Sequence, residues 1–301
     1  MFSITNLTGI KPTGLMHLGN EYGMQFSNSE FIMIADGHAF ADLQTFQDNE
    51  LYKIDETTAQ LVRSLMVIAP NCYIYRQTDI PEIFILFWIL LRFTKKGQMD
   101  RMHVFKAMEK DTNINIATYT YSVLMAADII IAGSNNVQIG IDQKQHIELA
   151  KYLIAKLSLK QPNFIFTKET LLGFDGRKMS KSYNNYIPSI CKSKDELMQY
   201  INKFITNSSD MHASKPPESM YQIIKSYVPE KFKAFALLYD NQSWRSIKEE
   251  FCSIIWDKIS NRICQYNNIS DTQIYEHLAT SAKIIQAQSA SLIKNILKKN
   301  L

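Results

Sequence analysis

The sequence predicts an α/β fold in which a Rossmann-like parallel sheet with helices on both faces is followed by a smaller all-helical domain. In the first part of the chain, short apolar runs alternate with helical stretches, and such alternation is typical of a parallel sheet covered on both sides. All ten glycines of the 301-residue chain lie at or before Gly176, so the rest of the chain reads as helices. We therefore expect a Rossmann-like domain over residues 1–190 and a helical domain over residues 191–301.

Four short apolar runs are the expected strands. They are rich in β-branched and aromatic residues, and polar or turn-forming residues follow them. Ligands of open parallel sheets bind beyond the carboxyl ends of the strands. The runs are residues 2–7, 31–36, 72–79 and 135–143. We therefore expect the functional residues at the ends of these runs and in the segments that follow them.

Sequence signals mark three helices in the second part. Ser193 and Glu196 have the spacing of a capping box, and the last helix is expected to begin near Thr272. An apolar stripe at helical spacing predicts a buried helix face. Its members are Trp244, Ile247, Phe251, Ile254, Ile255 and Ile259.

Composition narrows the class of protein. The net charge of +4 and the pI near 8.7 permit a polyanionic partner without requiring one. The four cysteines lie far apart with no C-x-x-C pair, so the sequence indicates neither a zinc site nor a disulfide scaffold. The first residues show no signal or transit segment, and we expect a cytoplasmic protein without a metal site of its own.

The longest apolar run, Ile83–Leu91, is too short to span a bilayer. It is flanked by Glu82 and Arg92. We expect a core helix there and no membrane association.

The stretch TGIKPTGLMHLGN, residues 8–20, follows the first expected strand. Its proline and glycines oppose regular structure, which indicates that the backbone has to come close to a ligand. Free N–H groups and the helix dipole at the N-terminus of the next helix favour a phosphate as that ligand. His17 and Asn20 are one helical turn apart, so both side chains can face the phosphate.

A second stretch, GRKMSKSYNN at residues 176–185, holds three cations among hydroxyls and amides. Read alone, it is a charge cluster on the surface. Placed near a nucleotide, Arg177, Lys178 and Lys181 would bind the triphosphate, because lysines act as mobile point charges on phosphate oxygens. They would also stabilise the charge that develops as pyrophosphate leaves.

Together these stretches resemble the paired ATP signatures of class I aminoacyl-tRNA synthetases, with HLGN at residues 17–20 and KMSKS at residues 178–182. Two others are similar to tryptophanyl-tRNA synthetases, YRQTDIPEIFILFWIL (75–90) and TYTYSVLMAADIII (118–131). The run DQKQHIEL (142–149) fits the tryptophanyl branch better than the tyrosyl branch, which shares the architecture.

The resemblance implies ATP-dependent activation of L-tryptophan to tryptophanyl-adenylate and its transfer to tRNA(Trp). It implies ATP and Mg²⁺ as cofactors and a homodimer whose helical domain reads the anticodon. It also implies catalytic roles for His17, Asn20, Lys178 and Lys181. The ATP-binding residues that it implies are Lys11, Thr13, Gly19, Asn20, Gly140, Asp142, Lys178, Met179, Ser180 and Lys181.

A pocket for the indole ring needs an apolar slot that ends in one hydrogen-bond acceptor, because the indole N–H is only a donor. Met125 and the two alanines after it can line such a slot, and Asp128 can accept the indole proton. The resemblance gives Asp128 this role and assigns Tyr121 and Gln143 to the ammonium and carboxylate groups of the amino acid. The alternative is a helix in which Asp128 only caps or pairs structurally.

Several other polar residues are candidates for the site. We expect His146 to position other groups, because the carboxylate of tryptophan is already a nucleophile at neutral pH and needs no proton transfer; a structural bridge to Asp142 is the alternative. Lys106 and Lys110 either reach the phosphates or form a solvated helix face. Candidates that end the second and third expected strands are Asp36, His38, Arg76, Gln77 and Asp79.

The sequence departs from the family pattern in two shortened segments, before residue 31 and after Leu157, and Ser122 stands where the family has a proline. The shortening suits a minimal enzyme. It also suits a diverged paralogue that forms an aminoacyl-adenylate for an acceptor other than tRNA. A nucleotide- or RNA-binding relative without catalysis is the third alternative, and the two intact ATP signatures oppose it.

Overall fold

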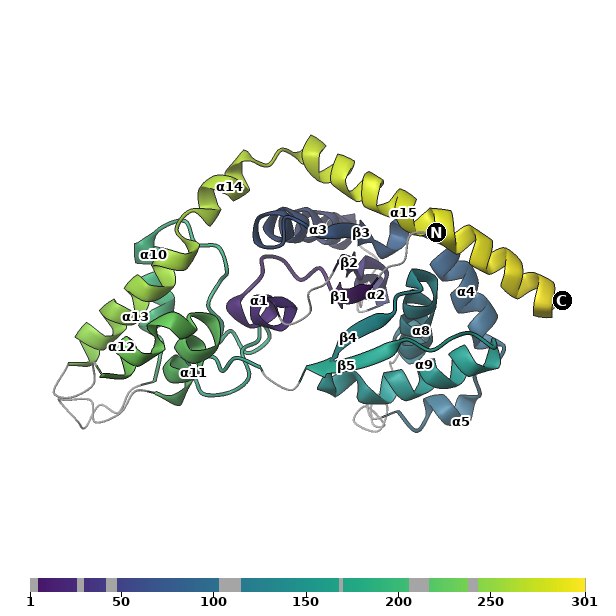
Figure 1. The fold of residues 1–301 in the computed structure, drawn as a ribbon, viewed down its shortest axis with the longest axis horizontal. Helices are drawn as coiled ribbons and strands as arrows, with labels where there is room; N and C mark the ends of the chain where they lie inside the picture. Colours follow the sequence, from purple (N-terminus) through teal and green to yellow (C-terminus); the bar gives the residue numbers. More distant parts are fainter. Residues whose placement is uncertain are drawn as a thin grey trace. The chain divides into compact units, whose positions relative to one another are not determined.

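The computed structural model describes residues 5–25, 30–41, 48–102, 115–167, 170–205, 217–237 and 243–300. The chain forms two compact units, which Figure 1 traces along the sequence. The sheet unit comprises Met1–Gly14, Ser27–Lys168 and Asp271–Leu301, and the helical unit comprises Leu15–Phe26 and Glu169–Ser270. The two units therefore divide the chain differently from the expected boundary at residue 190.

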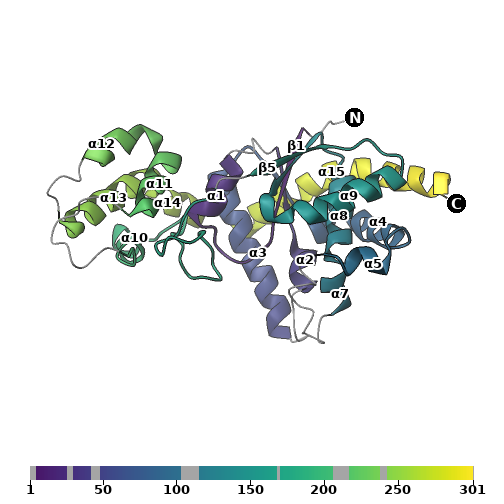
Figure 2. The same ribbon diagram turned by 90° about the horizontal axis from the view of Figure 1, so that it is seen from below.

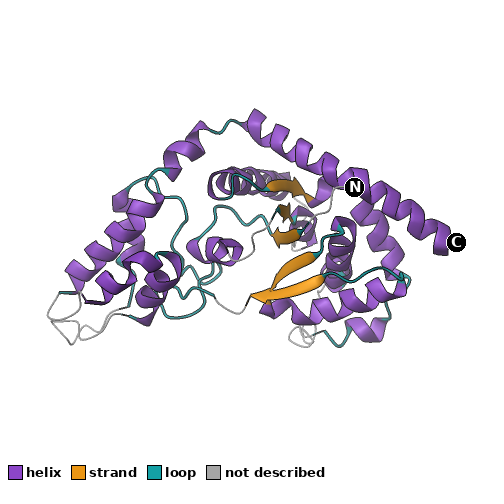
Figure 3. Ribbon diagram, in the orientation of Figure 1, coloured by secondary structure: helices purple, strands orange, loops and turns teal. Residues whose placement is uncertain are grey.

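The sheet unit is built on five parallel strands in the order β3-β2-β1-β4-β5 (Figure 3). With β1 in the middle, the chain moves outward in two opposite directions, as in doubly wound nucleotide-binding folds. The strands are β1 (Asn6–Ile10), β2 (Phe31–Ile34), β3 (Tyr73–Arg76), β4 (Asn136–Gly140) and β5 (Asn163–Thr167).

Each of the four expected strands has a counterpart in the sheet. β1 overlaps the first expected strand at residues 6–7 and ends three residues later than predicted, at Ile10, whereas the other three strands end earlier than predicted. β2, β3 and β4 stop at Ile34, Arg76 and Gly140, shortly before a helix or a 3-10 turn begins. Residues 1–4 of the first expected strand lie outside the described residues. The prediction lacks β5, which lies at the sheet edge and is partly exposed along its length. An edge strand of this kind shows no continuous buried apolar run in the sequence.

Helices cover both faces of this sheet, which confirms the predicted fold class. The chain passes from β1 to β3 in one direction and from β3 to β5 in the other, so right-handed crossovers place α3 on one face and α8 and α9 on the opposite face. The helices are α2 (Asp36–Ala41), α3 (Asp48–Ile68), α4 (Pro81–Leu91), α5 (Lys96–Met99), α7 (Ile116–Tyr119), α8 (Tyr121–Ala132), α9 (Lys144–Lys156) and α15 (Asp271–Asn300), with 3-10 turns at Gln77–Asp79 and Ile141–Gln143.

Helix α4 is the expected core helix on one side only. Ile83, Leu86 and Leu90 are buried, whereas Ile85 and Trp88 are 47% and 76% exposed. The exposed side chains give α4 an apolar outer face, which is uncommon for a surface that meets only water. Within the described ranges, no helix is long and apolar enough to cross a membrane.

The last helix, α15, begins where the sequence predicts it but packs in the sheet unit. Ser281 Oγ accepts a hydrogen bond from the Ile74 N–H of β3 (3.1 Å), and Gln288 Nε2 donates to the carbonyl of Ala132 at the end of α8 (2.7 Å). Figures 1 and 2 both show α15 beside α4. An apolar stripe predicts that a helix face is buried but not which element covers it.

The helical unit has an apolar core of its own, to which α13 contributes most of the predicted stripe; only Trp244 of that stripe is partly exposed. All four cysteines of the protein are free. The helices are α1 (Leu18–Gln25), α10 (Lys194–Ile201), α11 (Glu218–Tyr227), α12 (Phe232–Leu237), α13 (Trp244–Ile259) and α14 (Arg262–Asn268), with a 3-10 turn at Pro229–Lys231.

The expected cap of α10 is present. Ser193 Oγ accepts the N–H of Glu196 at 3.1 Å. The carboxylate of Glu196 in turn accepts the N–H of Lys192 at 2.5 Å, one residue before the position that a capping box uses. The first bond satisfies a backbone donor of the first helical turn, and the second satisfies the donor of the residue before the cap.

Phe251 provides a test of this core. Its ring is fully buried and lies with its centroid 5.5 Å from that of Phe204 and 5.9 Å from that of Phe235. We expect Phe251→Ala to lower the free energy of unfolding by about 3–5 kcal/mol, because it removes apolar contacts and leaves a cavity. Leu237→Ala, at a side chain that is 83% exposed, should change it by less than about 0.5 kcal/mol. Urea unfolding measures both values, and equal losses would contradict this account of the core.

Candidate active site

The HLGN signature forms the start of α1 in the helical unit. The N–H of His17 donates to Asn20 Oδ1 at 3.4 Å, and the N–H of Asn20 lies 3.3 Å from His17 Nδ1. His17 also forms an isolated β-bridge with Pro188, just after the second signature. His17 and Asn20 therefore cap the helix reciprocally, in addition to lying one turn apart as the sequence predicts.

The expected free N–H groups at this helix start are not present. Leu18 donates to the Ile187 carbonyl at 2.9 Å, and Asn20 and Glu21 donate to the His17 carbonyl at 2.9 and 3.2 Å. Only a weak acceptor, a thioether sulfur, receives the N–H of the remaining residue, Gly19. An anion at this site would therefore be bound mainly by side chains, because the sequence pattern predicts the helix start but not how its backbone donors are used.

The electrostatics of His17 favour a neutral ring. Burial lowers its pKa to about 3, with further lowering by the positive charges of Lys181 and Lys178. Because Nδ1 accepts a hydrogen bond from Asn20, the ring proton belongs on Nε2. His17 is therefore a neutral hydrogen-bond donor through Nε2 over the whole neutral pH range.

The two signatures contact each other. The N–H of Gly19 lies 3.3 Å from Met179 Sδ, across 160 residues of sequence. A Cβ atom at position 19 would lie 3.1 Å from the His17 ring and 3.3 Å from Met179 Cβ, so a larger residue would crowd both side chains. The structure thus brings together His17, Gly19 and Asn20 with Met179, as the resemblance implies.

A buried amide that the sequence analysis did not identify organises the KMSKS loop. Asn185 is fully buried, and its Oδ1 accepts the N–H of Ser180 at 2.8 Å. Its Nδ2 lies 2.7 Å from Asp175 Oδ1 and 3.1 Å from the Lys178 carbonyl. Its only sequence signal is the pair of asparagines that follows KMSKSY. Asn185 therefore holds both ends of the loop around the lysines.

The three cations of this loop differ in environment. Arg177 pairs with Asp175 at 2.6 Å and lies over the ring of Tyr183, so its charge is used within the loop. Lys178 is exposed. Lys181 is partly buried, and desolvation lowers its pKa from 10.5 to about 8. The positive charges of both lysines act on His17.

In the sheet unit, Asp128 on α8 is held by two neighbours. It is 2% exposed; His38 Nε2 lies 2.9 Å from its Oδ2, and Gln77 Nε2 donates to its Oδ1 at 2.7 Å. Gln77 Oε1 in turn accepts the backbone N–H of His38 at 3.1 Å. His38 and Gln77 come from the elements that follow β2 and β3, so the expected convergence of strand ends is present.

The Asp128 carboxylate keeps acceptor capacity in this arrangement. Burial raises its pKa, while the bonds from His38 and Gln77 oppose that rise. Each carboxylate oxygen can accept two hydrogen bonds, and each receives one here. The structural pairing that was the alternative for Asp128 therefore exists, and it leaves each carboxylate oxygen able to accept one further hydrogen bond.

An aromatic group lies next to this carboxylate. The ring of Tyr121 has its centroid 4.1 Å from that of His38 and 5.7 Å from that of His146. Lys11 Nζ lies 5.7 Å from the centre of the Tyr121 ring. Gln143 Oε1 lies 2.6 Å from His146 Nδ1. The structure thus connects Lys11, Tyr121 and Gln143, with His146 as the link to Gln143.

The remaining predicted residues occupy the same unit. Gly140 ends β4, and a Cβ atom there would lie 2.4 Å from Asp142 Oδ1, so a larger residue would require the Asp142 carboxylate to move. Asp142 accepts a hydrogen bond from Gln143 Nε2 at 3.3 Å. Met125 packs partly buried against the core, and Thr13 is exposed. Lys106 and Lys110 lie outside the described residues.

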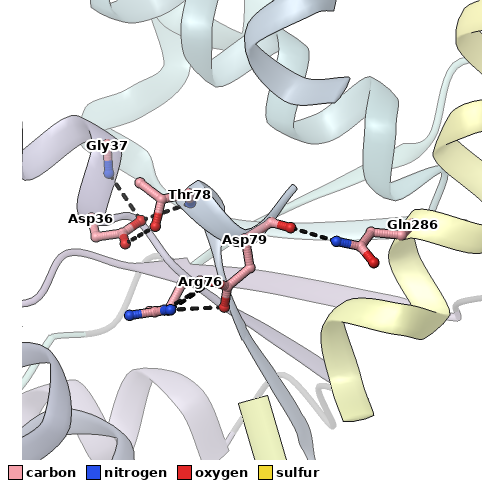
Figure 4. Close-up of polar contacts among 6 residues, drawn as sticks. All are labelled: Asp36, Gly37, Arg76, Thr78, Asp79 and Gln286. Atoms are coloured by element: carbon pink, nitrogen blue, oxygen red, sulfur yellow. Dashed lines mark hydrogen bonds and ion pairs between the residues drawn. The ribbon is translucent and has the colours of Figure 1, made fainter. Parts of the chain in front are cut away.

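A polar cluster at the ends of β2 and β3 includes the other candidates (Figure 4). Asp36 accepts from the N–H and the hydroxyl of Thr78 at 3.1 and 2.5 Å. Burial raises the pKa of Asp36, and the bonds from Thr78 oppose the rise. Arg76 pairs with Asp79, whose carbonyl accepts from Gln286 of α15 at 2.7 Å. These groups satisfy one another and support the strand ends.

Comparison with known proteins agrees with this geometry. Residues 3–250 match the family model of the class I tRNA synthetases for tryptophan and tyrosine (W and Y). The chain is 28% identical to the tryptophan–tRNA ligase of Neisseria meningitidis, over 96% of this chain and 95% of the relative. It is 33% identical to that of Rhodopirellula baltica, over 77% and 78%. Some other tryptophan–tRNA ligases are longer, and the chain spans 63% or 58% of their length.

Among solved structures, the tryptophanyl-tRNA synthetase of Campylobacter jejuni complexed with ADP and tryptophan superposes with a TM-score of 0.86. The two chains are 26% identical, and the match covers 98% of this chain and 99% of the other. The paired ATP signatures, the parallel sheet and these matches lead to one conclusion: the chain belongs to the class I aminoacyl-tRNA synthetases for tryptophan and tyrosine, and within them to the tryptophanyl branch.

Proposed function

We propose that the chain is a tryptophan–tRNA ligase that activates L-tryptophan with ATP and transfers it to tRNA(Trp) in the cytoplasm. The observation that carries the proposal is the contact between the two ATP signatures through Gly19 and Met179. A buried carboxylate in the sheet unit, Asp128, adds an acceptor of the kind that an indole ring needs. The relatives named tryptophan–tRNA ligase support the choice of amino acid.

The nucleotide is bound by side chains in this proposal. His17 donates through Nε2 and Asn20 through its amide to phosphate oxygens. Lys178 and Lys181 neutralise the charge that grows on the leaving pyrophosphate. We also assign ATP binding to the following residues: Lys11, Thr13, Gly19, Gly140, Asp142, Met179 and Ser180. Mg²⁺ arrives with ATP on its phosphate oxygens, which are the hard ligands that this ion prefers.

The amino acid is held at the Asp128 cluster. Asp128 accepts the indole N–H, and His38 and Gln77 keep the carboxylate in place for it. Met125 contributes an apolar wall, and Tyr121 and Gln143 bind the ammonium and carboxylate groups. An analogue without the N–H would leave the buried carboxylate without its donor, which is a strong basis for selection.

The chemistry follows from these contacts. A carboxylate oxygen of tryptophan attacks the α-phosphorus of ATP, the bond from that phosphorus to the bridging oxygen of the β-phosphate breaks, and pyrophosphate leaves. No proton has to move in this step, which suits a neutral His17 that only donates a hydrogen bond. Positioning and electrostatic stabilisation therefore supply the rate enhancement. In the second step a ribose hydroxyl of the tRNA attacks the mixed anhydride and AMP leaves.

The first test is tryptophan-dependent ATP–pyrophosphate exchange, with each of the twenty amino acids assayed separately. We expect exchange with tryptophan alone, and Asp128→Asn should lower kcat/KM for tryptophan by about tenfold or more, because an amide replaces the charged acceptor. Its KM for ATP should stay the same. Exchange that depends on another amino acid would refute the assignment of tryptophan.

Charging of tRNA tests the second step, in which we assign anticodon reading to the helices after residue 190. Transfer of radiolabelled tryptophan to tRNA(Trp), and not to a tRNA with another anticodon, is the expected result. Exchange without any charging would favour the diverged paralogue that uses an acceptor other than tRNA.

Lys181 makes the first step dependent on pH. Since its pKa is lowered to about 8, the side chain is protonated below that pH and loses its charge above it. We therefore expect kcat/KM for ATP to fall as the pH rises through about 8, and Lys181→Arg should abolish that fall, because arginine stays charged. Lys178→Arg is the matched control and should keep it. Lys181→Ala should slow exchange by about ten- to a thousandfold.

We also propose that the protein forms a homodimer through the outer face of α4. This face presents Phe84, Ile85 and Trp88, which are 37%, 47% and 76% exposed. A second copy of the chain can cover the face symmetrically, because a two-fold interface brings the same patch from both subunits together. An apolar patch centred on a tryptophan is typical of such interfaces.

Trp88→Glu tests the dimer. The charge would be buried without a partner in the interface, so the variant should dissociate at micromolar concentrations at which the wild type is a dimer. Leu237→Glu, at an exposed apolar residue of the helical unit, is the control and should remain a dimer. Light scattering coupled to size exclusion measures both masses. A dimeric Trp88→Glu variant would exclude this face as the interface.

A further inference from the structure

A buried charge cluster lies directly behind the HLGN signature. Glu21, the residue after Asn20, is fully buried. Its two carboxylate oxygens each accept a hydrogen bond from Arg262 at 2.7 Å, one from Nη1 and one from Nη2. The hydroxyl of Tyr227 donates to the same carboxylate at 2.8 Å. Arg262 also donates to the Ser189 carbonyl at 3.1 Å.

The cluster joins three elements of the helical unit that are far apart in the sequence. Glu21 is on α1, Tyr227 ends α11 and Arg262 begins α14. The pairs are separated by 206 and 241 residues. Lys258 of α13 lies over the Tyr227 ring, 4.3 Å from its centre, and donates to the Tyr227 carbonyl. Helices α11, α13 and α14 are thus connected to the helix that begins with HLGN.

The protonation states of Tyr227 and Arg262 fix which groups of the cluster donate hydrogen bonds and which group accepts them. Burial and the Glu21 carboxylate raise the pKa of Tyr227, so its hydroxyl remains a donor. Burial lowers the pKa of the Arg262 guanidinium, but its hydrogen bonds to Glu21 more than offset this effect. The pKa of Arg262 is therefore raised above its usual value, and the guanidinium remains charged. A planar guanidinium that faces a carboxylate with two bonds tolerates little rotation of either group.

Apolar packing alone would hold α1 less specifically. Leu18 and Tyr22 of this helix belong to the apolar core, and apolar contacts tolerate small rotations of a helix. The fork between Arg262 and Glu21 does not, because a rotation of α1 would leave a carboxylate without partners in a dry interior. Glu21 is bonded through its own N–H to the His17 carbonyl at 3.2 Å, so its position and that of the signature are linked.

We infer that Glu21, Arg262 and Tyr227 are positioning residues for adenylate formation: they fix the rotation of α1 and thereby the direction in which His17 and Asn20 meet the phosphates of ATP. The inference rests on the proposed function, since it specifies how the bound nucleotide is oriented. It also means that a change at α14, which belongs to the C-terminal part of the helical unit, is transmitted to the nucleotide signature.

The test compares Glu21→Gln, Arg262→Gln and the double variant in tryptophan-dependent exchange, at temperatures well below their unfolding transitions. We expect each single variant to lower kcat/KM for ATP by about ten- to a hundredfold, because a small misplacement of positioning groups costs that much. The KM for tryptophan should change less than about twofold. The double variant should be no worse than the single ones, since the groups act as one unit.

Two conservative variants guard against a loss of folding. Arg262→Lys keeps the charge without the fork and Tyr227→Phe removes one hydroxyl, so both should fold and show a smaller loss in kcat/KM for ATP. Arg63→Gln is the control for the loss of an arginine charge, because it breaks a more exposed arginine–aspartate pair, with Asp271, in the sheet unit. It should leave the kinetics for ATP unchanged.

Two results would overturn the inference. One is a set of variants with lowered unfolding temperature but unchanged kinetics for ATP, which would make the cluster purely structural. The other is an equal loss in Arg63→Gln. If the wild type shows no tryptophan-dependent exchange, the proposed function fails instead. Calorimetric binding of ATP to the same variants then decides the positioning role, with weaker binding in Glu21→Gln expected and unchanged binding against it.

Discussion

The close approach of Gly19 to His17 and Met179 is the constraint on which the nucleotide signatures depend. A side chain at position 19 would crowd His17 and Met179, which belong to two segments about 160 residues apart in the sequence. The same approach sets the electrostatics, because it buries His17 beside the charges of Lys178 and Lys181 and keeps its ring neutral. The close packing at Gly19 therefore places a neutral hydrogen-bond donor, His17, beside two cations, Lys178 and Lys181.

In the sheet unit, the surrounding side chains keep the buried carboxylate of Asp128 in place as a hydrogen-bond acceptor. A buried ionised group is costly unless it is hydrogen-bonded. His38 and Gln77 supply one bond to each oxygen of Asp128, and the bond between Gln77 and the His38 backbone fixes their own positions. Similar closed networks occur at the strand ends around Asp36 and at the start of α1 around Glu21. In all three places a carboxylate is held by partners from other elements.

The sequence predicts most strands and the signatures because both depend on local pattern. Apolar runs specify β2 to β4, and HLGN and KMSKS can be read as short strings. Pattern does not reveal partners: the sequence predicts where α15 begins, but only the fold shows that this helix packs against β3. β5 is missed because an edge strand is half exposed. Asn185 and the pair of Glu21 with Arg262 are missed because single polar residues carry no periodic signal, and their partners are set by the tertiary structure.

The placement of α15 has a consequence for the order in which the protein can fold during synthesis. The sheet unit contains the earliest strands, yet a hydrogen-bond acceptor for β3 and a donor for the end of α8 come from α15, with residues 169–270 of the helical unit between them in sequence. A nascent chain can complete the inserted helical unit around residues 169–270 while the sheet still lacks a covering helix. Non-local contacts of this kind form slowly and leave apolar surface exposed in the meantime. The sheet unit should therefore be the part of the nascent chain that depends most on chaperones, although it is translated first.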